Sequence, residues 1–176
     1  MFAKPSQRGL TLIELIVFIV IVSVALAGVL TVLNYTTRHS ADPMLRKQAL
    51  TIAEALLEEV MLQPFTWCDP DDAAAAIATG YASCATSENN LAAEAGEARA
   101  SATPLDNVND YNGVTTTTNI AGGGAATYAA NVTVAQSSLN GIAANASLLI
   151  TVSVTAGGET IQLQGYRTRY SPNSLP

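Results

Sequence analysis

Residues 8–15 read Arg-Gly-Leu-Thr-Leu-Ile-Glu-Leu, and they open the long apolar segment that decides the fold of this chain. Residues 10–33 contain one charged side chain, Glu14. A helix over these residues is about 36 Å long at about 1.5 Å per residue, which is enough to cross a hydrocarbon core of about 30 Å. The sequence therefore predicts one transmembrane helix. It contains no second run of this kind, which excludes a multi-span transporter.

The charges that flank the apolar segment indicate its orientation. Lys4 and Arg8 precede it, whereas only Arg38 follows closely. This small positive bias favours a cytoplasmic amino terminus and an extracytoplasmic domain. The segment is longer than the apolar part of a secretory signal peptide, which is about 7–15 residues. Small-x-small triplets at residues 23–25 and 25–27 leave cleavage inside the segment as an alternative.

The remainder of the chain is acidic and large enough for one domain. The full sequence has 176 residues and a formal net charge of −6. A net-acidic domain repels phosphate backbones, so we expect no general nucleic-acid binding. A local basic patch at Arg167 and Arg169 stays open.

Glu14 does not fit a plain membrane anchor. An ionised carboxylate in hydrocarbon is costly unless it is paired, which favours a functional role. A position near enough to the interface to stay hydrated explains the residue equally well when it is considered alone.

The stretch at residues 8–15, after a short basic leader, resembles the cleavage and methylation motif of type IV prepilins and type II secretion pseudopilins. The resemblance implies that prepilin peptidase removes residues 1–9 by cutting after Gly9 and methylates the new amino terminus at Leu10. Phe is usual at that position, so Leu10 departs from the pattern but stays hydrophobic. The resemblance also implies a single pass through the bacterial inner membrane and no cofactor. The partners would be membrane lipid, an inner-membrane assembly platform, and major and other minor pilins.

The same resemblance implies an assembly role for Glu14. Cleavage gives Leu10 a cationic amine, and methylation keeps that charge. When the apolar helices pack into a filament, Glu14 of an incoming subunit can pair with the Leu10 amine of its neighbour. The cost of leaving either buried charge unpaired would then set the axial register.

The sequence predicts a second helix over residues 42–64. Asp42 suits the N-cap, Pro43 suits the first turn, and Pro64 ends the helix. Apolar residues recur every three or four positions and predict a stripe that packs on the chain's own sheet; they are Leu45, Ala49, Ile52, Leu56 and Val60. The pattern is too short to establish a coiled coil. With the first helix it would form a spine that bends near residues 40–43, whose extracytoplasmic half is residues 34–65.

Alternating apolar and polar residues predict an antiparallel sheet within residues 128–176. Strands are expected at residues 128–136, 148–155 and 159–166, and Ala156-Gly-Gly at residues 156–158 predicts a tight hairpin. One apolar face of such a sheet would cover the helix stripe. The expected fold class is α+β and pilin-like, with a long kinked amino-terminal helix on a carboxy-terminal antiparallel sheet.

Residues 66–127 are expected to form a variable loop that folds back on the body, with a short helix near residues 71–78. Cys68 and Cys84 both lie on the extracytoplasmic side, where disulfides persist. We predict a bridge between them that closes a loop of about 17 residues and contributes roughly 3 kcal/mol.

The sequence gives no constellation for catalysis or for a metal. Two cysteines and His39 do not make a zinc site, and nothing places a nucleophile beside His39. Four oxygen-bearing residues cluster at positions 106–110, but their order does not match an EF-hand, so a capping turn is favoured over calcium; they are Asp106, Asn107, Asn109 and Asp110. We expect neither an enzyme nor a metal site.

A narrower resemblance concerns residues 49–65, 106–113 and 165–170, which look like the D-type minor pilins of mannose-sensitive haemagglutinin (MSHA) pili. It implies a minor pilin that acts in initiation or assembly of the pilus. The alternatives are a minor pseudopilin of a type II secretion system and a membrane-anchored adhesin or DNA-binding module.

Overall fold

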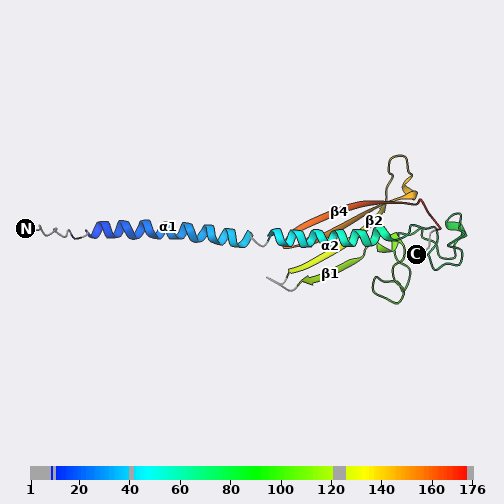
Figure 1. Cartoon of the computed structure of the whole chain (residues 1–176), viewed down its shortest axis with the longest axis horizontal. Coiled ribbons are helices and arrows are strands. Elements are labelled where there is room, and N and C mark those ends of the chain that lie inside the picture. Colours follow the sequence, from blue (N-terminus) through cyan, green and yellow to red (C-terminus); the bar gives the residue numbers. More distant parts are fainter. Residues whose placement is uncertain (1–8, 10, 40–41, 121–125, 174–176) are drawn as a thin grey trace, which may run out of the picture. The chain divides into compact units, whose positions relative to one another are not determined.

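The computed structural model of this chain describes residues 9, 11–39, 42–120 and 126–173 (Figure 1). The chain divides into two compact units, Met1–Pro43 and Met44–Pro176. The bend predicted near residues 40–43 falls partly on residues 40 and 41, which lie outside the described residues.

The first unit contains the helix α1 (Leu12–His39). Within its portion Leu12–Thr37, the most apolar stretch of 18 residues has a mean hydropathy of 3.0, and this portion is long and apolar enough to cross a membrane. Hydroxyl groups along α1 donate to carbonyls one turn earlier, as the Ser23 hydroxyl does to Ile19 O at 2.7 Å and Thr31 to Ala27 O at 2.8 Å. These bonds satisfy the hydroxyls inside the helix, as a lipid environment requires.

The second unit is built on the helix α2 (Asp42–Leu62), which belongs to it from Met44 onward. It ends two residues before Pro64, which cannot continue a helix. The predicted apolar stripe is confirmed: Ala49, Leu56 and Val60 are buried, and Leu45 and Ile52 pack against the same core. The helix lies across the sheet in Figure 1.

The sheet has four antiparallel strands in sequence order. They are β1 (Thr115–Ile120), β2 (Ala126–Gln136), β3 (Ser147–Ala156) and β4 (Glu159–Thr168). In the register, Val132 of β2 lies opposite Val152 of β3, and Val152 lies opposite Leu163 of β4. One face of β2 and β3 is buried with α2; its residues are Tyr128, Ala130, Val132, Val134, Leu148, Ile150, Val152 and Val154. The fold is therefore α+β and pilin-like, as the sequence predicted.

The turn between β3 and β4 consists of two residues, Gly157 and Gly158, within the hairpin predicted at residues 156–158. Their φ angles are 60° and 87°, in the left-handed region that a two-residue hairpin of this kind requires. A Cβ on Gly157 would also lie 3.0 Å from Leu45 Cδ1 of α2. Glycine at this position therefore serves both the turn and the close approach of the helix.

Strand β1 was not predicted, because it lies in the segment expected to be a loop. Its residues Thr-Thr-Thr-Thr-Asn-Ile are mostly exposed, so they lack the alternation of apolar and polar residues that reveals a half-buried strand. The run of β-branched threonines is the signal that could have found it. Among the described strands, β1 pairs with β2 alone and forms one edge of the sheet.

The prediction of a short helix near residues 71–78 is wrong, because this stretch forms successive turns. The Asp69 carboxylate accepts the Asp71 N–H at 2.7 Å, and Asp72 accepts the Ala74 N–H at 2.8 Å. Aspartate side chains that bond to the backbone two residues on compete with a helix. The part of the chain that the structure describes also contains short 3₁₀ turns: η1 (Tyr81–Ser83), η2 (Val108–Tyr111) and η3 (Ala144–Ala146).

Candidate functional site

The predicted cleavage position lies just before α1. Gly9 is exposed, whereas Leu10 lies outside the described residues. Thr11 O accepts the N–H groups of Glu14 at 3.1 Å and Leu15 at 3.2 Å, and these bonds form the first turn of the helix. The cleavage position is therefore separated from Glu14 by about one turn of chain.

Glu14 is the acidic residue in the first turn of α1, and its side chain is exposed. The positive end of the helix dipole favours a carboxylate there. Its neighbours are exposed apolar side chains, with Leu12 77% and Ile13 66% accessible. Glu14 thus presents one charge on a surface that is otherwise built for lipid or for other apolar helices.

Over residues 15–33 the surface of α1 is mostly apolar on all sides. Phe18, Val24 and Leu30 point in different directions around the helix and are each more than 60% exposed. A helix of this kind is stable only when an apolar environment surrounds it. A bilayer or a bundle of similar helices provides that environment.

An apolar amino-terminal helix that precedes a helix packed on a four-stranded antiparallel sheet defines a pilin-like protein. Residues 4–30 match the family model described as the prokaryotic N-terminal methylation motif. No curated protein and no solved structure matches the chain significantly. The motif supports the type IV prepilin and pseudopilin family, whose members are structural subunits. It implies processing by prepilin peptidase and assembly with other pilins, and together with α1 it fits a membrane-anchored pilin.

The loop region after α2 is stabilised by the predicted disulfide. Cys68 and Cys84 are bridged, with their Cα atoms 5.2 Å apart. Cys68 is buried in a small cluster with Ala75 and Ala78, and it also forms an isolated β-bridge with Ser87. The bridge therefore fixes a region that has little apolar core of its own.

Arg169 connects this loop region to the residues that follow β4. Its guanidinium lies 3.8 Å from the ring centre of Phe65, 4.1 Å from Trp67 and 5.0 Å from Tyr81. It donates hydrogen bonds to the Tyr81 hydroxyl and, at 2.8 Å, to Asn145 O. Burial lowers the pKa of Arg169. Its charge therefore faces aromatic rings instead of forming the basic patch with Arg167 that the sequence left open.

The capping turn expected at residues 106–110 is present. The Asp110 carboxylate accepts the Asn107 N–H at 2.7 Å at the start of η2. The Asn107 side chain donates to Thr66 Oγ1 at 2.6 Å. These residues are buried, so the turn is part of the interior.

The structure also brings Asp106 and Asp110 together with four carboxyl groups that lie far from them in the sequence. This carboxyl cluster consists of Asp69, Glu88, Glu94, Glu97, Asp106 and Asp110. The cluster was not predicted from the sequence, because its members are spread over about 40 residues without a regular spacing.

Burial and repulsion by neighbouring carboxylates raise the pKa values of three members of the cluster, Glu88, Asp106 and Asp110. Burial, with repulsion by Asp69, raises the pKa of Asp106 to about 6. Burial raises the pKa of Glu88 and of Asp110 further, and neighbouring carboxylates add to both shifts. Among the described residues, each charged neighbour that shifts these three pKa values is another carboxyl group.

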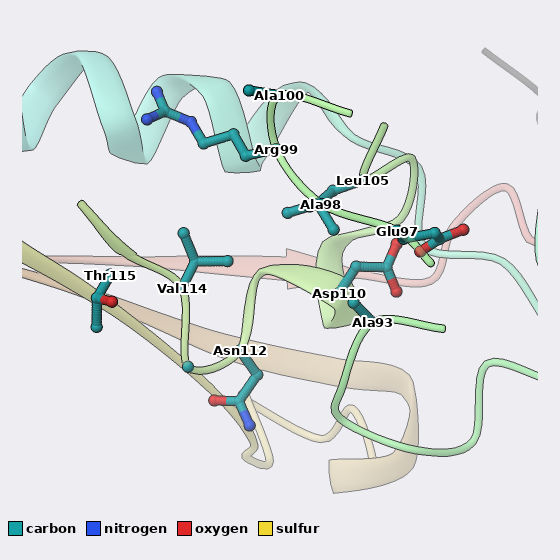
Figure 2. A pocket seen from close by; sticks show the side chains of 11 residues that line it. Ala93, Glu97, Ala98, Arg99, Ala100, Leu105, Asp110, Asn112, Val114 and Thr115 are labelled. Atoms are coloured by element: carbon teal, nitrogen blue, oxygen red, sulfur yellow. The ribbon is translucent and has the colours of Figure 1, made fainter. Parts of the chain in front are cut away.

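A pocket of about 440 Å³ lies beside the cluster. Figure 2 shows the carboxyl groups of Glu97 and Asp110 side by side at one end of it, with Arg99 pointing away from them toward α2. Arg99 pairs with Glu59 instead, donating from Nε to Oε1 at 2.7 Å. This contact lowers the pKa of Glu59, and it directs the charge of Arg99 away from the cluster.

Proposed function

We propose that this chain is a minor pilin that prepilin peptidase cuts between Gly9 and Leu10, and that takes part in initiation or assembly of a type IV pilus of the MSHA type. The observation that carries the proposal is the single carboxylate of Glu14 on the exposed apolar surface of α1, within the methylation motif. The work of the protein is then helix packing and register, not catalysis.

The chemistry of assembly follows from the two charges at the start of α1. Cleavage converts the uncharged amide at Leu10 into an amine, and methylation keeps it cationic. Glu14 of an incoming subunit pairs with this amine as the apolar helices move from lipid into the filament. An unpaired buried charge costs several kcal/mol, so only the register that pairs both charges is stable.

The MSHA assignment draws support from the way three separated parts of the chain pack together. These are the parts whose sequences look like the D-type minor pilins, residues 49–65, 106–113 and 165–170. The Val108 N–H donates to Pro64 O at 3.1 Å, and Arg169 stacks on Phe65. The three stretches thus form one packed region.

Gly165 extends this contact between the third stretch and α2. A Cβ at Gly165 would lie 3.3 Å from Met61 Sδ and 3.4 Å from Leu57 Cδ1. The absence of a side chain lets β4 approach the end of the helix closely. The resemblance therefore includes a glycine with a definite packing role.

The test is mass spectrometry of fibres sheared from the cell surface, without and with reduction. We expect small amounts of this chain beginning at methylated Leu10, with Cys68 bridged to Cys84. A chain that still carries residues 1–9 would contradict the role given to Glu14.

The same motif serves type II secretion pseudopilins, so a minor pseudopilin is the second candidate. A processed chain found only in the cell envelope, and absent from sheared fibres, would favour it. Binding of the chain to host glycans or DNA without any processing at Gly9 would instead favour a membrane-anchored adhesin or DNA-binding module.

A further inference from the structure

The carboxyl cluster brings six acidic side chains from separate parts of the loop region to one place. Three overlapping groups of three carboxylates each have oxygen atoms within 4.8 Å of one another. Glu94 and Glu97 share a group with Asp110, and Asp69 is common to the other two groups. The shared members make the cluster continuous.

The most buried members each leave one oxygen without a partner. Glu88 is 3% exposed and Asp110 is 1% exposed. One oxygen of each is fixed, because Glu88 Oε2 accepts from Asn109 Nδ2 and Asp110 Oδ2 accepts from the Asn107 N–H. The other oxygens, Glu88 Oε1 and Asp110 Oδ1, are buried and accept no hydrogen bond among the described residues.

Two further members show the same feature, since Glu94 Oε2 and Asp106 Oδ1 are also buried without a partner among these residues. A buried polar atom without a partner is costly and is rare in native proteins. Several such oxygens on one continuous set of carboxyl groups indicate a missing positive partner. Arg99 does not supply it, because its guanidinium is bound to Glu59.

We propose that the carboxyl cluster is a calcium-binding site. Calcium takes six to eight oxygen ligands at about 2.3–2.6 Å, so two ligands of one ion lie at most about 5 Å apart. The spacing within each group, 4.8 Å or less, meets this limit. A set of several carboxylates suits calcium, whose coordination geometry is flexible, better than magnesium, which requires near-octahedral geometry and retains water.

The donor atoms also argue against a softer metal. Zinc and copper prefer sulfur and nitrogen ligands. Cys68 and Cys84 are joined in the disulfide, and the sequence contains a single histidine, His39, which belongs to the other unit. An all-oxygen anionic site selects a hard cation.

The proposed ion would attach the long loop region to the sheet. Next to Asp110, the Asn112 Oδ1 atom accepts the Val134 N–H at 2.9 Å, and the Gly113 N–H donates to Val132 O at 3.0 Å. An ion held by Asp110 together with Glu94 and Glu97 would therefore connect a distant part of the loop to β2. This role is independent of whether the filament is a pilus or a secretion pseudopilus.

The test is calorimetric titration of the full chain in detergent micelles, first treated with EDTA and then titrated with calcium chloride or magnesium chloride. We expect saturable calcium binding, at least tenfold weaker magnesium binding, and a higher melting temperature with calcium. Terbium luminescence sensitised by aromatic residues, with displacement by calcium, provides an independent readout. Absence of saturable binding and of any thermal shift would overturn the proposal.

Two variants locate the site, and a third is the matched control. Asp110→Asn keeps the size of the side chain and an oxygen for the Asn107 N–H, while Glu94→Gln removes a charge from a less buried position. Each should weaken calcium binding at least tenfold. Glu54→Gln, on the exposed side of α2, should bind calcium as the unchanged chain does.

The melting temperature in EDTA separates a ligand from a purely structural residue. Removing one of several repelling carboxylates should leave that temperature unchanged or raise it, while reducing the shift that calcium produces. If Asp110→Asn does not fold, Glu94→Gln decides the question by the same two measurements. Unchanged calcium affinity in Glu94→Gln and in any folded Asp110→Asn would show that the cluster is not the site.

Discussion

The helix α1 and the loop region after α2 differ in where they place acidic side chains. α1 exposes one carboxylate, Glu14, on a surface of apolar residues. The loop region buries several carboxylates within a polar interior. In both, the partner of the charge is proposed to come from outside the chain: a neighbouring subunit for Glu14 and a calcium ion for the cluster. The difference teaches that a charged residue in an unusual environment can be recognised from the sequence only when the residues that form this environment are its neighbours along the chain.

The largest expected effect is that of Glu14→Ala on filament entry. The Leu10 amine of a neighbour would lose its partner in an apolar core, which costs several kcal/mol. The amount of this chain in sheared fibres should fall by more than about tenfold for a loss of that size. Quantitative mass spectrometry of fibres and membranes measures it.

Membrane insertion and cleavage after Gly9 should be normal in the Glu14→Ala variant, because neither depends on a neighbouring subunit. Glu54→Ala, outside the apolar helix, is the control and should enter fibres normally. Normal incorporation of the Glu14→Ala variant into fibres would contradict the proposed pairing of Glu14 with the Leu10 amine of a neighbouring subunit.

The next effect concerns the disulfide of the loop region. Replacing both Cys68 and Cys84 by Ser should lower the free energy of unfolding by about 2–4 kcal/mol, because the unfolded chain regains freedom over the closed loop. Denaturant unfolding of the full chain in detergent measures it. The helical signal of α1 should persist at denaturant concentrations that unfold the second unit. Loss of this signal together with the unfolding of the second unit would show that the two units do not unfold separately.

Arg169→Lys tests the aromatic stack in the same region. Lysine keeps the charge but loses the planar group that lies on Phe65, Trp67 and Tyr81, so a loss of about 1–2 kcal/mol is expected. The near-ultraviolet circular dichroism of the single tryptophan should change as well. Arg46→Lys, exposed on α2, is the matched control. An equal response of both variants would show that the stack contributes nothing specific.

The smallest effect is expected for the ion pair between Glu59 and Arg99. Arg99 lowers the pKa of Glu59 below its ordinary value of 4.5 in the folded chain. The stabilisation is therefore present above that value and is lost as the pH falls through the lower, folded pKa. Because both side chains are partly exposed, Glu59→Gln should cost only about 0.5 kcal/mol at neutral pH.

Unfolding by urea at pH 7 and at pH 3 measures this difference, which should shrink at the lower pH. Glu58→Gln, on the exposed side of the same turn, is the control and should show less dependence on pH. A loss at pH 3 that is as large as at pH 7 would mean that Glu59 acts through packing and not through its charge.

The prediction succeeded for elements whose surroundings repeat regularly along the chain. α1 follows from its long apolar run, whereas α2, the strands β2 to β4 and the hairpin at Gly157 and Gly158 follow from periodicity, proline or glycine. β1 did not, because an exposed edge strand of threonines has no buried face to mark it. The prediction of a helix near residues 71–78 was wrong because aspartate side chains accept hydrogen bonds from the backbone there and stabilise turns.

The sequence by itself determined the apolar helix, the methylation motif with Gly9 and Glu14, and the α+β order of elements, since each depends on neighbours in the chain. Only the tertiary structure placed Arg169 on its aromatic rings and gathered the carboxyl cluster. Those contacts join residues separated by tens of positions, and folding sets their distances, burial and charge.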